Sequence, residues 1–83
     1  MRRHRWKQLE SSSLQSVWYD RKRYRLYVTF NSGHRYMYYG VSYYRYRRLV
    51  KADSIGKYFY YNVRSNFECK KLKEEDIRGR FLG

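Results

Sequence analysis

Apolar and polar positions alternate most regularly in the segment 24–30. Large apolar side chains occupy every second position there, namely Tyr24, Leu26, Val28 and Phe30. A period of two in a run rich in β-branched and aromatic residues is typical of a strand with one buried face. A similar run at 34–39 follows Asn31-Ser32-Gly33, a sequence that favours a hairpin turn. Together with the apolar stretch 16–19, these segments predict an antiparallel three-stranded meander.

The spacing becomes helical after Gly40. Ser42 is a typical N-cap residue, and apolar side chains then recur on one side of a helix predicted to end near Ala52: Tyr43, Tyr46, Leu49 and Val50. Ser54 is predicted to cap a second short helix, whose buried stripe is Ile55, Phe59 and Val63. The segment 67–72 is predicted to be a final strand. The expected fold class is α+β, with the three-stranded antiparallel meander, two short helices on one sheet face and this final strand.

A chain of 83 residues is expected to form one domain. We divide it into a basic N-terminal arm at 1–12, an α+β domain at 13–72 and a charged C-terminal tail at 73–83. No apolar run approaches the roughly 20 residues that a membrane span needs, and the start lacks the apolar segment of a secretory signal. The single cysteine, Cys69, excludes an intramolecular disulfide and fits a reducing cytoplasm, which is the predicted location.

Charge is the strongest compositional signal. The chain contains 20 Lys and Arg against 7 Asp and Glu, which gives a formal net charge of +13 and a pI near 10.1. Such a field attracts nucleic acid, an anionic membrane or an acidic protein surface. A membrane partner is not expected, because the basic residues alternate with tyrosines at strand spacing instead of forming an amphipathic helix with a broad apolar face.

Residues suited to catalysis or metal binding are few and scattered. His4, His34 and Cys69 are the candidates for soft-metal ligands or nucleophiles, and they lack the paired spacing of a metal site. The carboxylates at 74–76 fall in the charged tail, where a solvated run of charge explains them. Cys69 is expected to be a small, half-buried strand residue. The sequence therefore predicts a protein that is not an enzyme and that uses no metal or cofactor.

One face of the predicted sheet has the chemistry of nucleic-acid binding. If the alternating apolar side chains of the predicted strands face the helices, the opposite face of the sheet presents Trp18, Arg25, Tyr27, Arg35, Met37 and Tyr39. Aromatic rings on such a face stack on unpaired bases for about 1–3 kcal/mol each, and arginines bind phosphates. The alternatives for this face are packing against a second subunit and cover by the N-terminal arm. Tyr36 and Tyr38 have the buried parity and are assigned to the core.

The outer side of the first helix is a second candidate surface. By helical phase, Tyr44, Arg48 and Lys51 converge there, with Arg45 and Arg47 at the flanks. An ordinary solvated helix face is the alternative explanation. The basic arm is expected to add long-range attraction to a polyanion through Arg2, Arg3 and Arg5.

Several short runs occur in the order and spacing of a known family. They are Leu26-x-Val28-x-Phe30, Ser32-Gly33, Tyr36-x-Tyr38 and Gly40-Val41, followed by Tyr46, Leu49, Ala52-x-Ser54-x-Gly56-Lys57-Tyr58-Phe59, Val63-Arg64 and Phe67. From about Ser13 to Leu72, collinearly and without large gaps, the chain resembles the KTSC domain family. Two departures are Ser42, where a Pro commonly follows the Val, and Tyr60-Tyr61, which makes a usually more polar region aromatic.

The resemblance supports the fold more strongly than it supports a function. The family is named for its place at the C-terminus of some lysyl-tRNA synthetases, and it also occurs as small stand-alone bacterial and phage proteins. Its function is not established, and RNA binding is the usual proposal.

Two hypotheses of different class follow. The first is a non-catalytic module that binds RNA or single-stranded nucleic acid through its basic and aromatic surface. The alternative is a small phage-type or regulatory protein whose basic surface binds an acidic host protein or a ribonucleoprotein enzyme. Either protein would act as a monomer or a homodimer.

Overall fold

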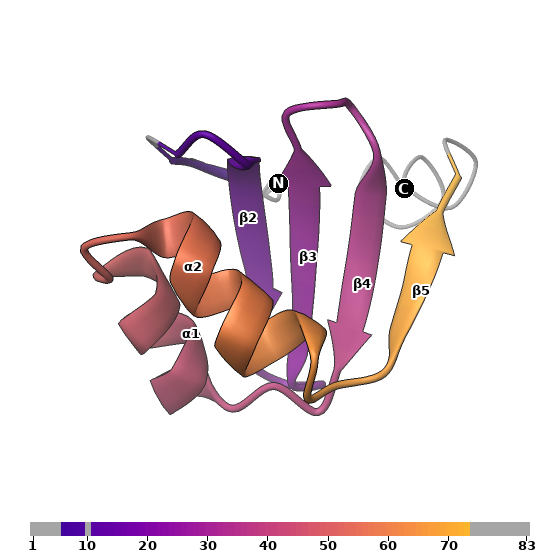
Figure 1. Ribbon diagram of the computed structural model, residues 1–83. Helices are drawn as coiled ribbons and strands as arrows, with labels where there is room; N and C mark the ends of the chain where they lie inside the picture. Colours follow the sequence, from indigo (N-terminus) through magenta and orange to yellow (C-terminus); the bar gives the residue numbers. More distant parts are fainter. Residues whose placement is uncertain (1–5, 10, 74–83) are drawn as a thin grey trace.

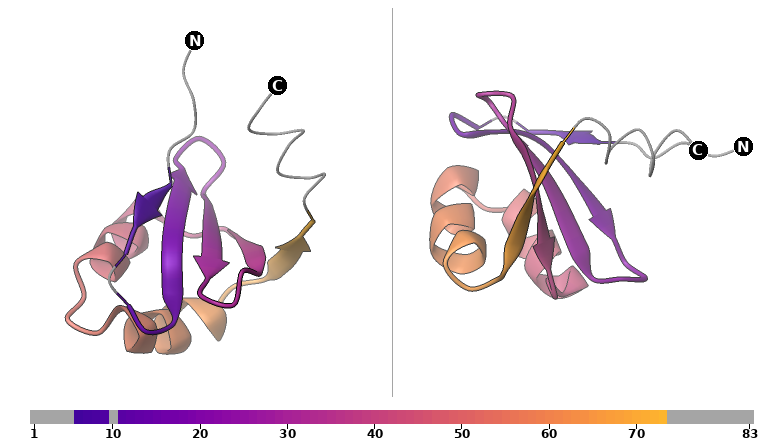
Figure 2. Two further views of the ribbon diagram at one scale, coloured as in Figure 1. Left: turned by 90° about the horizontal axis from the view of Figure 1, so that it is seen from above. Right: turned by 90° about the vertical axis from the view of Figure 1, so that its right-hand side faces the viewer.

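A sheet with helices on one of its faces forms the protein, and the computed structural model describes residues 6–9 and 11–73 (Figure 1, Figure 2). In chain order the elements are β1 (Lys7–Gln8), β2 (Leu14–Asp20), β3 (Arg25–Phe30), β4 (Arg35–Tyr39), α1 (Tyr43–Val50), α2 (Ile55–Phe59), the π-helix η1 (Tyr60–Arg64) and β5 (Cys69–Leu72). The predicted α+β class is confirmed.

The sheet has five strands in the order β1-β2-β3-β4-β5, and every neighbouring pair is antiparallel. The predicted meander corresponds to β2, β3 and β4. The two edge strands differ from the prediction, since β1 lies within the segment predicted as an arm and β5 begins at Cys69 instead of Phe67. The Phe67 N–H donates to the Val63 carbonyl at 3.2 Å, so this residue still belongs to the turn that follows η1.

The turn between β3 and β4 follows from Asn31-Ser32-Gly33. Gly33 has a φ of 97°, a left-handed backbone angle that favours glycine. Its N–H donates to the Phe30 carbonyl at 2.8 Å, and the Phe30 N–H donates to the His34 carbonyl at 2.9 Å. These bonds close the hairpin and set the register that places Leu26 opposite Tyr38.

The helices begin where the sequence predicts but differ in their caps. The Ser42 hydroxyl accepts a 3.1 Å hydrogen bond from the Arg45 N–H and so caps α1, as predicted. Ser54 precedes α2 but makes no side-chain cap hydrogen bond. α2 continues directly into η1, and the i+4 stripe of apolar residues does not distinguish this widened turn from an ordinary α-helix.

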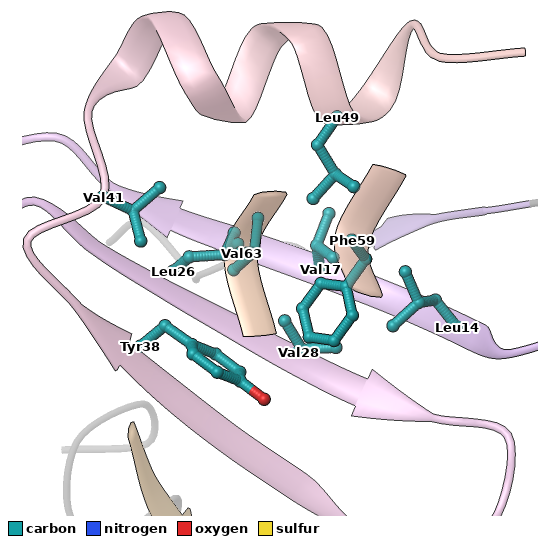
Figure 3. Close-up of a cluster of buried hydrophobic side chains, with 9 residues drawn as sticks. All are labelled: Leu14, Val17, Leu26, Val28, Tyr38, Val41, Leu49, Phe59 and Val63. Atoms are coloured by element: carbon teal, nitrogen blue, oxygen red, sulfur yellow. The ribbon is translucent and has the colours of Figure 1, made fainter. Parts of the chain in front are cut away.

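Side chains from the sheet and the helices form the main core, drawn in Figure 3: Leu14, Val17, Leu26, Val28, Tyr38, Val41, Leu49, Phe59 and Val63. The inward parity predicted for Leu26, Val28 and Tyr38 is therefore confirmed. Tyr24, predicted to share that face, precedes β3 and is 57% exposed, because its φ of 56° takes it out of the strand conformation. Leu14 and Val17 both reach this core although they have opposite parity. A β-bulge between Leu14 and Ser16 shifts the register and explains this exception.

The opposite face of the sheet has a second, smaller core. Tyr27 and Met37 are 1% and 2% exposed, and Leu72 completes the buried cluster. Trp6 and Trp18 pack against it, with ring centroids 6.5 Å and 4.8 Å from that of Tyr27. Trp6 directly precedes β1, so the short edge strand brings an aromatic side chain over the middle of the sheet. A sheet packed on both faces increases the buried share of a small chain.

Candidate nucleic-acid interface

An open groove runs along the outer side of α1. Its volume is about 620 Å³, and it is lined by Tyr43, Tyr44, Arg47, Arg48, Lys51, Ala52 and Tyr58. Apart from Ala52, every lining residue is aromatic or cationic, and none of them is acidic. Tyr44, Arg48 and Lys51 cluster because residues four and three positions apart lie on one side of a helix. The convergence predicted for these three residues is thus present in the structure.

Tyr44 and Arg48 form a hydrogen-bonded pair on successive turns of α1. Nη2 of Arg48 donates to Oη of Tyr44 at 2.8 Å, and the guanidinium carbon lies 4.9 Å from the ring centroid. Tyr44 nevertheless remains 66% exposed. The pair therefore presents an aromatic ring and a fixed positive charge side by side to solvent.

Tyr43 contacts arginines from two different elements. Arg21, in the turn after β2, has its guanidinium carbon 4.1 Å from the Tyr43 ring centroid. Arg47, one helical turn along α1, lies 5.8 Å from the same centroid. Both arginines are exposed. The turn and the helix thus bring two cations to one ring that lines the groove.

Half-buried tyrosines hold α1 in place from the side of the sheet. The rings of Tyr19 and Tyr46 stack with centroids 4.8 Å apart and planes 9° apart. The Tyr19 hydroxyl also donates to the Val41 carbonyl at 2.6 Å. Burial raises the pKa of both Tyr19 and Tyr46 above the ordinary value of 10.0. The groove side of the helix is therefore oriented by packing that does not involve Tyr44 or Arg48.

The cations of the groove have no carboxylate partner in residues 6–9 and 11–73. The salt bridge found in this part of the chain joins Arg23 to Asp20 at 3.2 Å, in the turn after β2. Arg47, Arg48 and Lys51 are all exposed. Their charges therefore add to one another and leave a positive field that an anionic ligand can neutralise.

The sheet surface predicted to bind nucleic acid is assembled but is not an open platform. Trp18, Tyr27 and Tyr39 share the face opposite the helices. Arg25 and Arg35 lie on the same face. The guanidinium carbon of Arg25 is 5.6 Å from the Tyr39 ring centroid, and that of Arg35 is 5.9 Å from the Trp6 ring centroid. Tyr27 is buried because Trp6 and Trp18 pack over it. Its ring is not available to stack on a base, which corrects the exposure expected for this residue.

Arg45 does not line the groove that it was predicted to flank. Its Nη1 donates to the Asn62 carbonyl at 3.2 Å, and its guanidinium carbon lies 5.5 Å from the Phe67 ring centroid. Arg45 therefore connects α1 to η1 and the turn beyond it. The arm residues Arg2, Arg3 and Arg5 lie outside the described residues, so their contribution stays a prediction.

Sequence patterns do not identify every residue of the groove. Tyr58 lines the groove from α2, and Arg21 contacts the groove residue Tyr43 from a turn; no motif links either residue to α1. The basic run 21–23 indicates a charged turn but not its neighbour. Helical phase places Tyr43 on the buried side, whereas the structure has it half-buried and lining the groove. These three placements depend on how α1 packs against the turn and α2.

The described residues contain neither a metal-binding cluster nor a membrane-spanning helix. No group of three His, Cys, Asp or Glu side chains in them could hold a metal ion. No helix in them has the length and apolar character needed to cross a bilayer. Cys69, predicted to be half-buried, is exposed at the start of β5.

Comparison with known proteins identifies the family. The model of the KTSC domain matches residues 10–67, which is more than half of the chain. The chain belongs to the KTSC domain family. A KTSC domain protein from Yersinia pestis has a similar structure, with a TM-score of 0.80 and 26% sequence identity over 83% of this chain and 97% of that one. No curated protein matches the sequence. The matched part of this KTSC domain extends from β2 to η1, so the α1 groove lies within it.

Proposed function

We propose that this KTSC domain is a non-catalytic module that binds RNA or single-stranded nucleic acid through the groove along α1. The observation that supports the proposal is one open groove that combines three rings and three cations: Tyr43, Tyr44, Tyr58, Arg47, Arg48 and Lys51. Tyrosine rings stack on unpaired bases for about 1–3 kcal/mol each, and cations neutralise the adjacent phosphates. The cytoplasm is the proposed location, since an exposed lone thiol such as Cys69 persists in a reducing compartment.

A single strand suits the groove better than a duplex. Stacking on Tyr44 requires the face of an unpaired base, which the interior of a duplex does not offer. Ring and guanidinium contacts of this kind do not depend on the hydrogen-bonding edge of a base, so the binding is expected to tolerate many sequences. The formal net charge of +13 adds an attraction that depends strongly on salt.

The test uses two lysines that differ in their position relative to the groove. Lys51 lines it, whereas Lys57 is exposed on α2 and does not. Affinity for a labelled oligouridine is measured by fluorescence anisotropy over a range of salt concentrations, for the wild type, Lys51→Gln and Lys57→Gln. Lys51→Gln is expected to weaken binding and to reduce the log–log salt slope by about 0.7, the value for one phosphate contact on a single strand. Lys57→Gln is expected to leave the slope nearly unchanged.

Three outcomes would contradict the proposal. Equal losses in the two lysine variants would indicate a diffuse charge effect instead of a groove. Absence of binding at low salt would exclude RNA as the ligand. A stoichiometric protein partner retained from nuclease-treated bacterial lysate, without measurable RNA affinity, would replace RNA by an acidic protein.

A further inference from the structure

A second hollow lies on the helix side of the sheet, beyond the area that the helices cover. Figure 1 shows α1 and α2 in front of the β2 and β3 side, whereas β5 stands clear at the opposite edge. The hollow has a volume of about 430 Å³ and is formed by the β3–β4 turn, β4, the end of η1 and the start of β5. Small-molecule sites typically have volumes of about 300–1,000 Å³.

Aromatic rings form the floor of this hollow. Tyr36 and Tyr38 come from β4, and Phe30 is the last residue of β3. Phe30 meets Tyr36 and Phe59 edge to face at centroid distances of 5.6 Å and 5.5 Å, and Tyr38 meets Phe59 at 5.3 Å. Because Phe59 belongs to the main core, the floor rings are held by core packing and the hollow is preformed.

Polar side chains surround this floor. The rim consists of Ser32, His34, Arg64 and Cys69, all exposed, and none of the lining residues is acidic. Arg64 is the last residue of η1, and its guanidinium carbon lies 5.5 Å from the ring centroid of Tyr60. This contact holds a positive charge at the rim of an aromatic hollow.

The Tyr38 hydroxyl adds a hydrogen-bond donor near this charge. The pKa of Tyr38 is raised from its ordinary value of 10.0 to about 12. Burial is the largest cause and the neighbouring Cys69 is the second, while the charge of Arg64 lowers the pKa. The hydroxyl therefore remains protonated at neutral pH. Arg64 and Tyr38 line the same hollow, and a guanidinium and a hydroxyl together suit the oxygens of a phosphate.

We propose that this hollow binds a nucleoside monophosphate. The base packs on the rings of Tyr36 and Phe30, and the phosphate binds Arg64 with His34 beside it. Each part of the hollow corresponds to one part of this ligand, since an uncharged aromatic compound would not use the guanidinium and inorganic phosphate would not use the rings. The hollow shares no lining residue with the α1 groove, so the proposal does not depend on RNA binding there.

Cys69 provides a reporter for occupancy. It is the one cysteine of the chain, it is exposed, and it lines the hollow. Alkylation by iodoacetamide, followed by intact-protein mass spectrometry, therefore reports on this site alone. With AMP at ten times its dissociation constant, only about a tenth of the protein is unoccupied, and the alkylation rate is expected to fall about tenfold.

Matched variants separate the hollow from general charge effects. Arg64→Gln is expected to abolish protection by AMP, whereas Lys57→Gln, which also removes one exposed positive charge, is expected to retain it. Protection is expressed as the ratio of rates with and without AMP in each variant, so that changes in the intrinsic reactivity of the thiol cancel. Lys51→Gln in the α1 groove is expected to retain protection, which keeps this test independent of RNA binding. Amide chemical shifts of Ser32 and His34 are expected to move with AMP.

Adenosine and inorganic phosphate are the two partial ligands, and both are expected to protect much less than AMP. The proposal is overturned if millimolar AMP neither slows alkylation nor shifts these amides, or if Arg64→Gln is protected as well as the wild type. Protection by adenosine equal to that by AMP would exclude the phosphate site. Equal protection by phosphate would exclude the base site.

Discussion

The guanidinium carbon of Arg21 lies 4.1 Å from the ring centroid of Tyr43, which joins the turn after β2 to the first residue of α1. A cation–π contact at an exposed site contributes about 0.5–1 kcal/mol. This contact also places a cation from the sheet side against Tyr43, a residue that lines the groove along α1. The groove is therefore a feature of the assembled domain and not of α1 alone.

Replacing Arg21 by Gln is expected to weaken single-stranded RNA binding about fivefold, equivalent to about 1 kcal/mol, because the variant loses a positive charge beside a groove residue and its contact with Tyr43. Anisotropy titrations at one fixed salt concentration measure the change. Arg23→Gln is the matched control, because Arg23 lies in the same turn but pairs with Asp20 at 3.2 Å. Equal effects of the two substitutions would show that the turn contributes only its net charge.

Two tyrosines are expected to separate stability from binding. Tyr27→Ala removes a buried ring and should lower the free energy of unfolding by about 3–5 kcal/mol. Tyr44→Ala removes an exposed ring, so it should change stability by less than about 0.5 kcal/mol but weaken RNA binding by about 1–3 kcal/mol. Urea unfolding and anisotropy measure the two quantities. If the Tyr27 variant does not fold, Tyr27→Leu is used. Weakened RNA binding by folded Tyr27→Leu, with wild-type binding by Tyr44→Ala, would move the site to the sheet face.

The N-cap of α1 is expected to contribute more to the stability of the protein than the N-cap of α2. Ser42→Ala should lower the free energy of unfolding by about 1 kcal/mol, because its hydroxyl accepts the hydrogen bond from the Arg45 N–H. Ser54→Ala should have a much smaller effect, since Ser54 makes no side-chain cap hydrogen bond. Urea denaturation of both variants tests the difference. A loss as large for Ser54 as for Ser42 would refute this assignment of the caps.

Stability is expected to fall in strongly alkaline solution because of Tyr38. Its pKa is about 12 in the folded protein, mainly through burial, against an ordinary value of 10.0. Between these values the unfolded chain releases a proton that the folded protein retains, so the free energy of unfolding decreases as pH rises. Below pH 10.0 the contribution of the Tyr38 hydroxyl to the free energy of unfolding is fully present. Tyr38→Phe removes it, and the free energy of unfolding of the wild type relative to that of the variant should therefore decrease from pH 10 to pH 12 in urea titrations. A difference independent of pH would show that the hydroxyl does not titrate in this way.

Much of the fold could be predicted because strand parity and helix capping are local properties. The alternation of Leu26 and Val28 predicts the inward face of β3, and Ser42 marks the start of α1. Leu14 could not be placed by parity, because the bulge beside Ser16 shifts the register. Parity also places Tyr27 away from the helices, but its burial depends on Trp6, which is distant in the sequence.

The candidate site also contains residues that local sequence patterns predict and residues that only tertiary packing places. Tyr44, Arg48 and Lys51 follow from helical phase, and the structure brings them together. Arg21 and Tyr58 come from other elements, so their positions depend on tertiary packing that no single segment encodes. Arg45 shows the converse, since its phase places it beside the groove while its hydrogen bond with Asn62 directs it elsewhere.

The order of the strands has a consequence for how the chain folds. From β1 to β4, strands that are consecutive in the chain pair with one another across short connections. Short connections cost little loop-closure entropy, and contacts between near neighbours favour rapid folding. β5 is the exception, because α1, α2 and η1 separate it from β4. We therefore expect the sheet to grow hairpin by hairpin from its N-terminal side, with the pairing of β5 as the late step that completes it.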